Sequence, residues 1–162
     1  MSIAGHPVVV RRAEPSDAEA IHTTFLGARA IAGTLQLPYP SVEMWRRRLA
    51  EGVSTDYLLV ATIAGEVVGN LGLRAASKSP RRRHVGDVGM AVRDDRQRRG
   101  VGTALMHAAI ELADGWLNYQ RLELTVLPTT SRRWRCIASS DSPSKALAAP
   151  MRIATAAMSM HT

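Results

Sequence analysis

The chain of 162 residues is poor in cysteine and in long apolar runs. Its single cysteine, Cys136, can form neither a disulfide nor a cysteine metal site within the chain, which fits a reducing cytoplasm. A membrane-spanning helix needs about 20 consecutive apolar residues, and no such run is present. No long apolar stretch follows Arg11 and Arg12, so the sequence shows no signal peptide. We therefore expect a cytoplasmic protein without a membrane partner.

Acidic residues are also scarce relative to basic ones. The net charge is +7 and the pI is about 10.7, values that invite a nucleic-acid partner. The excess is uneven, because residues 1–128 hold 16 basic and 13 acidic side chains, whereas residues 129–162 hold five and one. The run Arg81–Arg83 has no aromatic neighbours on which bases could stack. We therefore expect no nucleic-acid partner.

Hydrophobic patterning predicts one domain with the order β-α-α-β-β-β-α-β. The predicted strands cover residues 8–12, 57–63, 67–73, 84–92 and 121–126, and the predicted helices cover residues 15–30, 42–49 and 101–116. Ala64-Gly65-Glu66 joins the second and third strands as a hairpin. This order indicates an α/β fold with a mixed central sheet rather than a doubly wound parallel sheet.

The segment Gln97–Thr103 is the most informative motif, because it joins a predicted strand to a predicted helix. The first turn of a helix has free main-chain N–H groups and partial positive charge, which suit a pyrophosphate. Gly100 and Gly102 let the backbone approach a ligand closely. The motif lacks the Lys-Ser/Thr ending of a Walker loop, and Leu105 replaces the third glycine of a dinucleotide-binding turn. A glycine-containing turn with no ligand is the alternative.

The spacing Q-x-x-G-x-G resembles the acetyl-CoA loop of the GNAT N-acetyltransferases. The resemblance to the bacterial L-amino acid N-acetyltransferase branch extends over residues 7–128, through Gly33–Ser41, Met44-Trp45, His84–Asp87, Trp116-Leu117 and Leu122–Val126. The resemblance implies a GNAT fold. It also implies an enzyme that uses acetyl-CoA as co-substrate and transfers the acetyl group to a primary amine of a small molecule, with an L-amino acid as the expected acceptor. An inactive acetyl-CoA-binding remnant is the alternative. A homodimer is also compatible with the resemblance.

The resemblance also assigns site residues. Asp87 becomes the general base, because desolvation within an apolar strand would raise its proton affinity, although a structural carboxylate is the alternative. The acceptor pocket would include Gln36, Tyr39 and Trp45. Acetyl-CoA would be bound by Met90, Ala91, Val92, Gln97, Arg98, Arg99, Gly100, Val101, Gly102 and Thr103. His84 faces away from Asp87 by strand parity, and no metal-ligand pattern occurs, so we expect no metal.

Residues 129–162 do not resemble the family. The family continues with a helix that ends in a Leu-Tyr-Arg-Lys-x-Gly-Phe-like string and with two strands, whereas this segment has no Val, Phe or Tyr. A one-base shift at the Pro128 codon would explain the difference, because codons for residues 134–142 can encode Val-Ala-Leu-Tyr-Arg-Lys-Phe-Gly-Phe in the neighbouring frame. A divergent tail and a fusion are the alternatives.

The family's proton donor to the coenzyme A thiolate, a tyrosine, falls on Ile137 in this numbering, and Cys136 beside it is a weak substitute. We therefore expect a GNAT domain over residues 1–128 that lacks its usual C-terminal helix and hairpin. Residues 129–162 are expected to be poorly packed, or helical without joining the sheet, since their composition is unsuited to core strands.

Overall fold

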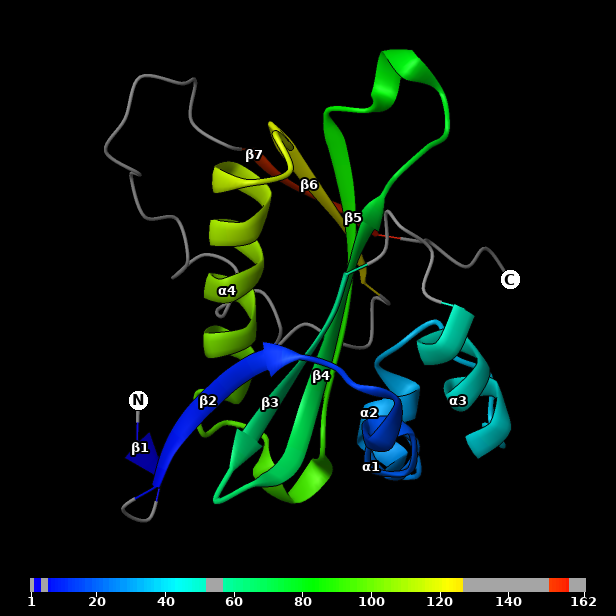
Figure 1. Cartoon of the computed structure of the whole chain (residues 1–162), viewed down its shortest axis with the longest axis vertical. Helices are drawn as coiled ribbons and strands as arrows, with labels where there is room; N and C mark the ends of the chain where they lie inside the picture. The colour runs from blue at the N-terminus through cyan, green and yellow to red at the C-terminus, as the bar shows by residue number, and fades with distance from the viewer. Residues whose placement is uncertain (1, 4–5, 52–56, 127–151, 158–162) are drawn as a thin grey trace.

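The computed structural model describes residues 2–3, 6–51, 57–126 and 152–157, which form one mixed sheet with helices on both faces (Figure 1). The strands lie side by side in chain order: β1 (Ser2–Ile3), β2 (His6–Arg12), β3 (Tyr57–Ile63), β4 (Glu66–Ala75), β5 (Val85–Val92), β6 (Arg121–Val126) and β7 (Arg152–Ala157). The α-helices are α1 (Ala18–Thr24), α2 (Ala28–Ala32), α3 (Val42–Glu51) and α4 (Val101–Gly115). The predicted α/β fold with a mixed sheet is confirmed.

The mode of strand pairing changes once across the sheet. β1 to β5 pair antiparallel, whereas β5–β6 and β6–β7 pair parallel. The predicted hairpin joins β3 to β4 through Ala64 and Gly65, whose φ angles are 50° and 82°. A two-residue hairpin turn whose twist matches that of the strands needs positive φ at both residues. Glycine adopts such a φ without strain, which explains a glycine at this position. A parallel β5–β6 pair requires a crossover, and α4 supplies it.

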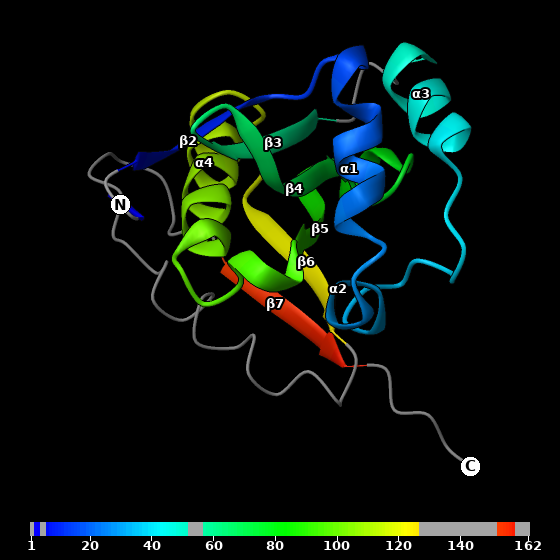
Figure 2. The same cartoon turned by 90° about the horizontal axis from the view of Figure 1, so that it is seen from below.

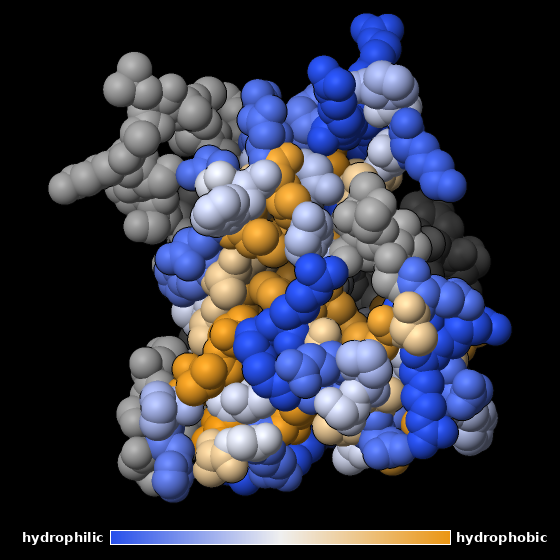
Figure 3. Space-filling view, in the orientation of Figure 1, coloured by the Kyte–Doolittle hydropathy of each residue, from blue (hydrophilic) through white to orange (hydrophobic). Residues whose placement is uncertain are grey.

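Two apolar cores lie on opposite faces of the sheet. Figure 2 shows α4 on one side and α1 to α3 on the other. The α4 face is built on fully buried side chains such as Leu71, Leu105 and Leu122, whereas the other face packs Ile21, Phe25 and Trp45 against the sheet. Figure 3 shows apolar side chains gathered across the middle of the face seen in Figure 1, with charged residues around them.

The single helix predicted over residues 15–30 is wrong, because the chain turns between α1 and α2. The turn includes Gly27, where an added Cβ would lie 2.7 Å from the carboxyl carbon of Asp94. That carboxylate accepts hydrogen bonds from the main-chain N–H groups of Arg29 (3.0 Å) and Ala30 (2.9 Å). A tertiary contact therefore supplies α2 with its own N-terminal cap and starts a separate helix.

The expectation that residues 129–162 add no strand is wrong for β7, which pairs in parallel with β6 from Arg121↔Arg152 to Val126↔Ala157. An edge strand offers main-chain N–H and C=O groups to any extended segment, whatever its side-chain pattern. Composition alone therefore could not exclude this pairing. The described residues do not include 127–151 and 158–162, and so exclude Cys136 and Ile137. The predicted poor packing of residues 129–162 concerns this part of the chain and stays a prediction.

Gly86 of β5 packs closely against the segment that leads into β6. An added Cβ would lie 2.7 Å from Cδ2 of Tyr119 and 2.8 Å from Cδ2 of Leu122. We expect Gly86→Ala to lower the free energy of unfolding by about 1–3 kcal/mol, because both neighbours are buried and must shift. Gly89→Ala is the matched control on the same strand, where an added Cβ meets nothing within 4 Å. Equal urea midpoints for the two variants would contradict the predicted crowding.

Candidate active site

β5 and β6 separate halfway along β5. Their parallel ladder runs from Val85↔Arg121 to Val88↔Leu124 and ends there, whereas β5 stays paired with β4 as far as Gly69↔Val92. The last half of β5 therefore has a strand neighbour on one side and a gap on the other. The sequence places Met90, Ala91 and Val92 on this half, so the structure puts these three predicted residues at the gap.

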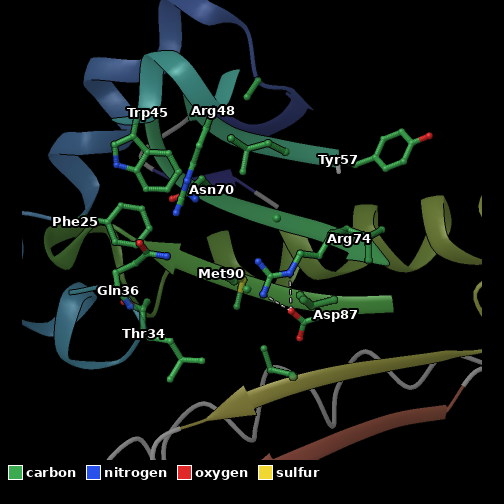
Figure 4. Close-up of a pocket in the computed structure, with 18 of the residues that line it drawn as sticks. Phe25, Thr34, Gln36, Trp45, Arg48, Tyr57, Asn70, Arg74, Asp87 and Met90 are labelled. Atoms are coloured by element: carbon green, nitrogen blue, oxygen red, sulfur yellow. Dashed lines mark hydrogen bonds and ion pairs between the residues drawn. The ribbon is translucent and has the colours of Figure 1, made fainter. Parts of the chain in front are cut away.

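A cavity of about 540 Å³ lies where the two strands separate. Gly89 and Met90 of β5 and Leu124 and Thr125 of β6 line one end of it. The opposite wall comes from Phe25 at the end of α1, from α3 and from the segment after α2, and includes the predicted acceptor residues Gln36 and Trp45 (Figure 4). Its size lies within the range of small-molecule sites.

Asp87 lies in this cavity beside a guanidinium group, not among apolar side chains alone. Arg74, its cross-strand partner, donates from Nε (2.9 Å) and from an Nη atom (2.6 Å) to the Oδ2 atom of Asp87. The Asp87 side chain keeps 24 % of its surface exposed and Arg74 keeps 64 %. The apolar neighbours expected from the sequence are thus joined by a guanidinium group, because strand pairing brings in a charge that the local sequence does not contain. Oδ1 is the carboxylate oxygen that Arg74 does not bind.

The segment before α4 has an unusual backbone and leaves main-chain N–H groups at the start of the helix. Arg98 and Gly100 have positive φ angles of 62° and 82°, and α4 begins at Val101. The N–H of Ala104 donates to the carbonyl of Gly100 at 3.0 Å, so the N–H groups of residues 101–103 precede the intrahelical hydrogen bonds. Helix dipole and free N–H groups together are features that suit an anion at this end of α4.

The charges around this helix start favour an anion as well. Arg93 is neutralised by Asp95 (2.6 Å) and Glu66 (2.5 Å), and its guanidinium group lowers the pKa of both carboxyl groups. Arg98 and Arg99, by contrast, are exposed and have no acidic partner among the described residues. The uncompensated positive charge therefore lies on the two arginines that the sequence predicts for the pyrophosphate.

Comparison with known proteins identifies the family. The model of the acetyltransferase (GNAT) family matches residues 27–138, which is more than half of the chain. The chain belongs to the GNAT family. Over 119 residues it is also 44% identical to the L-amino acid N-acetyltransferase AaaT of Escherichia coli (strain K12), covering 74% of this chain and 72% of that protein. The family match runs ten residues beyond the limit of the resemblance found in the sequence, which ends at residue 128.

Solved structures support the fold. A GCN5-related N-acetyltransferase from Kribbella flavida has a TM-score of 0.67 and 25% identity, covering 82% of this chain and 80% of that one. The yncA protein of Salmonella typhimurium, determined with its cofactor acetyl-CoA, has a TM-score of 0.68 and 17% identity, covering 82% and 77%. Together with AaaT, the family shows that this GNAT protein is an enzyme that transfers an acetyl group to an amino group. An inactive remnant is not favoured.

The structure of this GNAT protein brings four of the predicted site residues together in the cavity: Gln36, Trp45, Asp87 and Met90. The predicted residues 97–103 do not line it and lie before and at the start of α4. Tyr39 does not line the cavity: its residue surface is 97 % exposed, and it lies between two prolines with a φ of 62°.

Ala91 and Val101 of the GNAT site are buried in the two cores, so only their main chains can serve a ligand. Gln97 has a positioning role, because its amide nitrogen donates to the carbonyl of Val92 (3.0 Å) and to Asp94 (3.1 Å). Asp94 is a residue that sequence reasoning missed. Its carboxylate joins Gln97, in the segment predicted for acetyl-CoA, to the N-terminus of α2, a link that spans about 65 residues and leaves no local pattern.

The described residues of the GNAT chain hold no group of three or more His, Cys, Asp or Glu side chains that could bind a metal ion. In the same residues, no helix is both long and apolar enough to span a membrane.

Proposed function

We propose that this enzyme acetylates the α-amino group of L-amino acids and takes the acetyl group from acetyl-CoA. The observation that carries the proposal is the gap between β5 and β6, beside which Met90 lines the cavity that contains Asp87. The Cε atom of Met90 also lies 3.4 Å from where a Cβ at Gly102 of α4 would stand. The name of AaaT, at 44% identity, supports an L-amino acid as the acceptor. A cytoplasmic location and a homodimer stay predictions.

The residues present fit acetyl-CoA along this path. The pyrophosphate would accept hydrogen bonds from the main-chain N–H groups of residues 98–103, with Arg98 and Arg99 supplying charge. The pantetheine would run along the main chain of Met90, Ala91 and Val92 in the gap. Bound there, acetyl-CoA supplies a thioester whose carbonyl carbon is open to attack by an amine. The structure at α4 and the gap at β5 therefore suit the two ends of one extended ligand.

Asp87 has the role of general base in this proposal. An amino acid arrives as an ammonium ion, and a proton must leave before its nitrogen can attack. The Oδ1 atom of Asp87 takes that proton, directly or through one water molecule. The new N–C bond forms as the C–S bond breaks, and the departing thiolate takes up a proton. Arg74 keeps the carboxylate oriented toward the cavity through Oδ2.

The acceptor proposal is tested with acetyl-CoA labelled in the acetyl group and a panel of proteinogenic L-amino acids. We expect labelled N-acetyl amino acid to form in step with free coenzyme A thiol. Thiol release without an acetylated amino acid would contradict an amino acid acceptor while leaving the transferase activity in place.

The tail should limit activity. Ile137 cannot donate a proton to the thiolate, and residues 129–162 lack the sequence strings of the family's usual helix and hairpin. We expect a version with the reading frame restored after codon 128 to turn over at least about tenfold faster, since proton transfer contributes roughly 10²–10⁴-fold. Both proteins are assayed with the same amino acids, and the nucleotide sequence across codon 128 is determined. Equal turnover would show that the tail replaces the lost elements, and an uninterrupted native frame would remove the frameshift explanation.

A further inference from the structure

The α3 side of the cavity carries a cation that acetyl transfer does not use. The guanidinium carbon of Arg48 stands 5.0 Å from the centre of the Trp45 ring. Trp45 is itself held by a stacked contact with Phe25, with ring centres 5.1 Å apart and an 11° angle between planes. A cation–π contact with a fixed ring holds Arg48 against the cavity wall. Figure 4 shows Arg48 and Trp45 on one side of the cavity, opposite Asp87.

Of the three arginines that line the cavity, Arg74 is committed to Asp87 through two hydrogen bonds. Arg12 lies over the ring of Tyr57 at 5.4 Å, as Arg48 lies over Trp45, and what distinguishes Arg48 is its place beside Asn70 (Figure 4). Among the described residues, no acidic side chain forms an ion pair with Arg48. Its positive charge is therefore available to a ligand.

Asn70 supplies a second unsatisfied group in the same cavity. It is 4 % exposed on β4, and its Oδ1 atom has no hydrogen-bond partner among the described residues. A buried acceptor without a partner destabilises the empty site, so a ligand that donates a hydrogen bond is favoured there. In Figure 4, Asn70 lies on the same side of the cavity as Arg48. This side thus offers a cation for an anionic group and an acceptor for an N–H group.

We infer that Arg48 binds the α-carboxylate of the acceptor and selects amino acids over amines that lack this group. The planar guanidinium group matches a carboxylate through two parallel hydrogen bonds, and Asn70 Oδ1 accepts from the neighbouring ammonium group. Asn70 pairs with Ala91 and Arg74 pairs with Asp87, four residues apart along the β4–β5 ladder, so the ammonium group faces Asp87 across the cavity and its proton reaches Oδ1 through water. This inference rests on the proposed function, because it takes the amine substrate to be an amino acid.

The test compares matched acceptors that differ only in the carboxylate: L-leucine with 3-methylbutylamine, and L-phenylalanine with 2-phenylethylamine. We expect Arg48→Gln to raise KM for the amino acids about 10- to 100-fold, the range for hydrogen bonds to a charged group, and to leave KM for both amines unchanged. For Arg48→Lys, KM for the amino acids should lie between the values of the unaltered enzyme and of Arg48→Gln, because lysine keeps the charge without the planar guanidinium group. Acetyl-CoA affinity should stay constant throughout.

Arg47→Gln is the matched control, because Arg47 is the preceding residue of α3, is 69% exposed, and does not line the cavity. Arg47→Gln should leave KM for the amino acids and KM for the amines unchanged. An unchanged KM for the amino acids in Arg48→Gln, or an equal loss for amino acids and amines, would overturn the inference. The inference would also be overturned if Arg12→Gln, and not Arg48→Gln, removed the preference for amino acids over the matching amines.

The proposed function can fail separately. If the unaltered enzyme acetylates the amines but no amino acid, the proposed acceptor is wrong. Arg48 is then judged by calorimetric titration of L-leucine and L-phenylalanine into the enzyme saturated with coenzyme A. The carboxylate site is supported if the unaltered enzyme and Arg47→Gln bind these amino acids and Arg48→Gln does not. It is overturned if the unaltered enzyme does not bind them.

Discussion

Asp87→Asn is expected to lower turnover about 10²–10⁴-fold, the usual contribution of a general base, without changing acetyl-CoA affinity. The amide has the shape of the carboxylate but cannot accept a proton from the ammonium group. Asp87 lines the cavity and leaves Oδ1 outside its pair with Arg74. The measurements are kcat from thiol release over a range of pH and acetyl-CoA affinity from calorimetry. Because high pH deprotonates the amine in solution, the variant should recover part of its rate there.

Arg74→Gln is the control for this prediction. It removes the same ion pair but keeps the carboxylate, so a loss caused only by the broken pair should appear equally in both variants. We expect Arg74→Gln to reduce kcat much less than Asp87→Asn does. An unchanged rate and an unchanged pH profile in Asp87→Asn would make Asp87 a structural carboxylate.

Replacing Gly100 and Gly102 together with valine should abolish acetyl-CoA binding, with a loss of at least about 100-fold in affinity, or roughly 2.7 kcal/mol. Gly100 has a φ of 82°, a conformation that costs a residue with a Cβ about 1–2 kcal/mol. A Cβ at Gly102 would lie 3.4 Å from the Cε atom of Met90, which is the side of α4 that faces β5. Valine at both positions would therefore shift the N–H groups and fill the approach of the pyrophosphate.

Gly115→Val is the matched control, since Gly115 lies at the other end of α4 and an added Cβ there meets nothing within 4 Å. Calorimetric titration with acetyl-CoA and thermal melting with and without it compare the two proteins. An affinity of the double variant within about threefold of the original, a change under ~1 kcal/mol, would place the acetyl-CoA site elsewhere.

Sequence reasoning was most successful where structure depends on local pattern. The ranges of β3 and β6 and the start of α4 at Val101 agree with the predicted ones, because apolar alternation and a glycine before a helix are local features. The resemblance to GNAT enzymes likewise placed Gln36 and Trp45 at the cavity.

Features that depend on distant contacts were not predictable in this way. The pairing of Arg74 with Asp87 follows from the β4–β5 register, and the capping of α2 by Asp94 follows from a contact across the fold. β7 joins the sheet through main-chain hydrogen bonds, which composition does not report. In each case the missing information was which segments meet, since the residues themselves were ordinary for their local sequence.

A crystal structure of the enzyme with acetyl-CoA tests the central claim most directly, namely that the gap between β5 and β6 holds the acetyl donor. We predict the pyrophosphate on the main-chain N–H groups of residues 98–103, the pantetheine beside Met90 to Val92, and the acetyl group in the cavity with Asp87. Acetyl-CoA bound on another face, or β6 paired with β5 along its full length in the complex, would contradict the account.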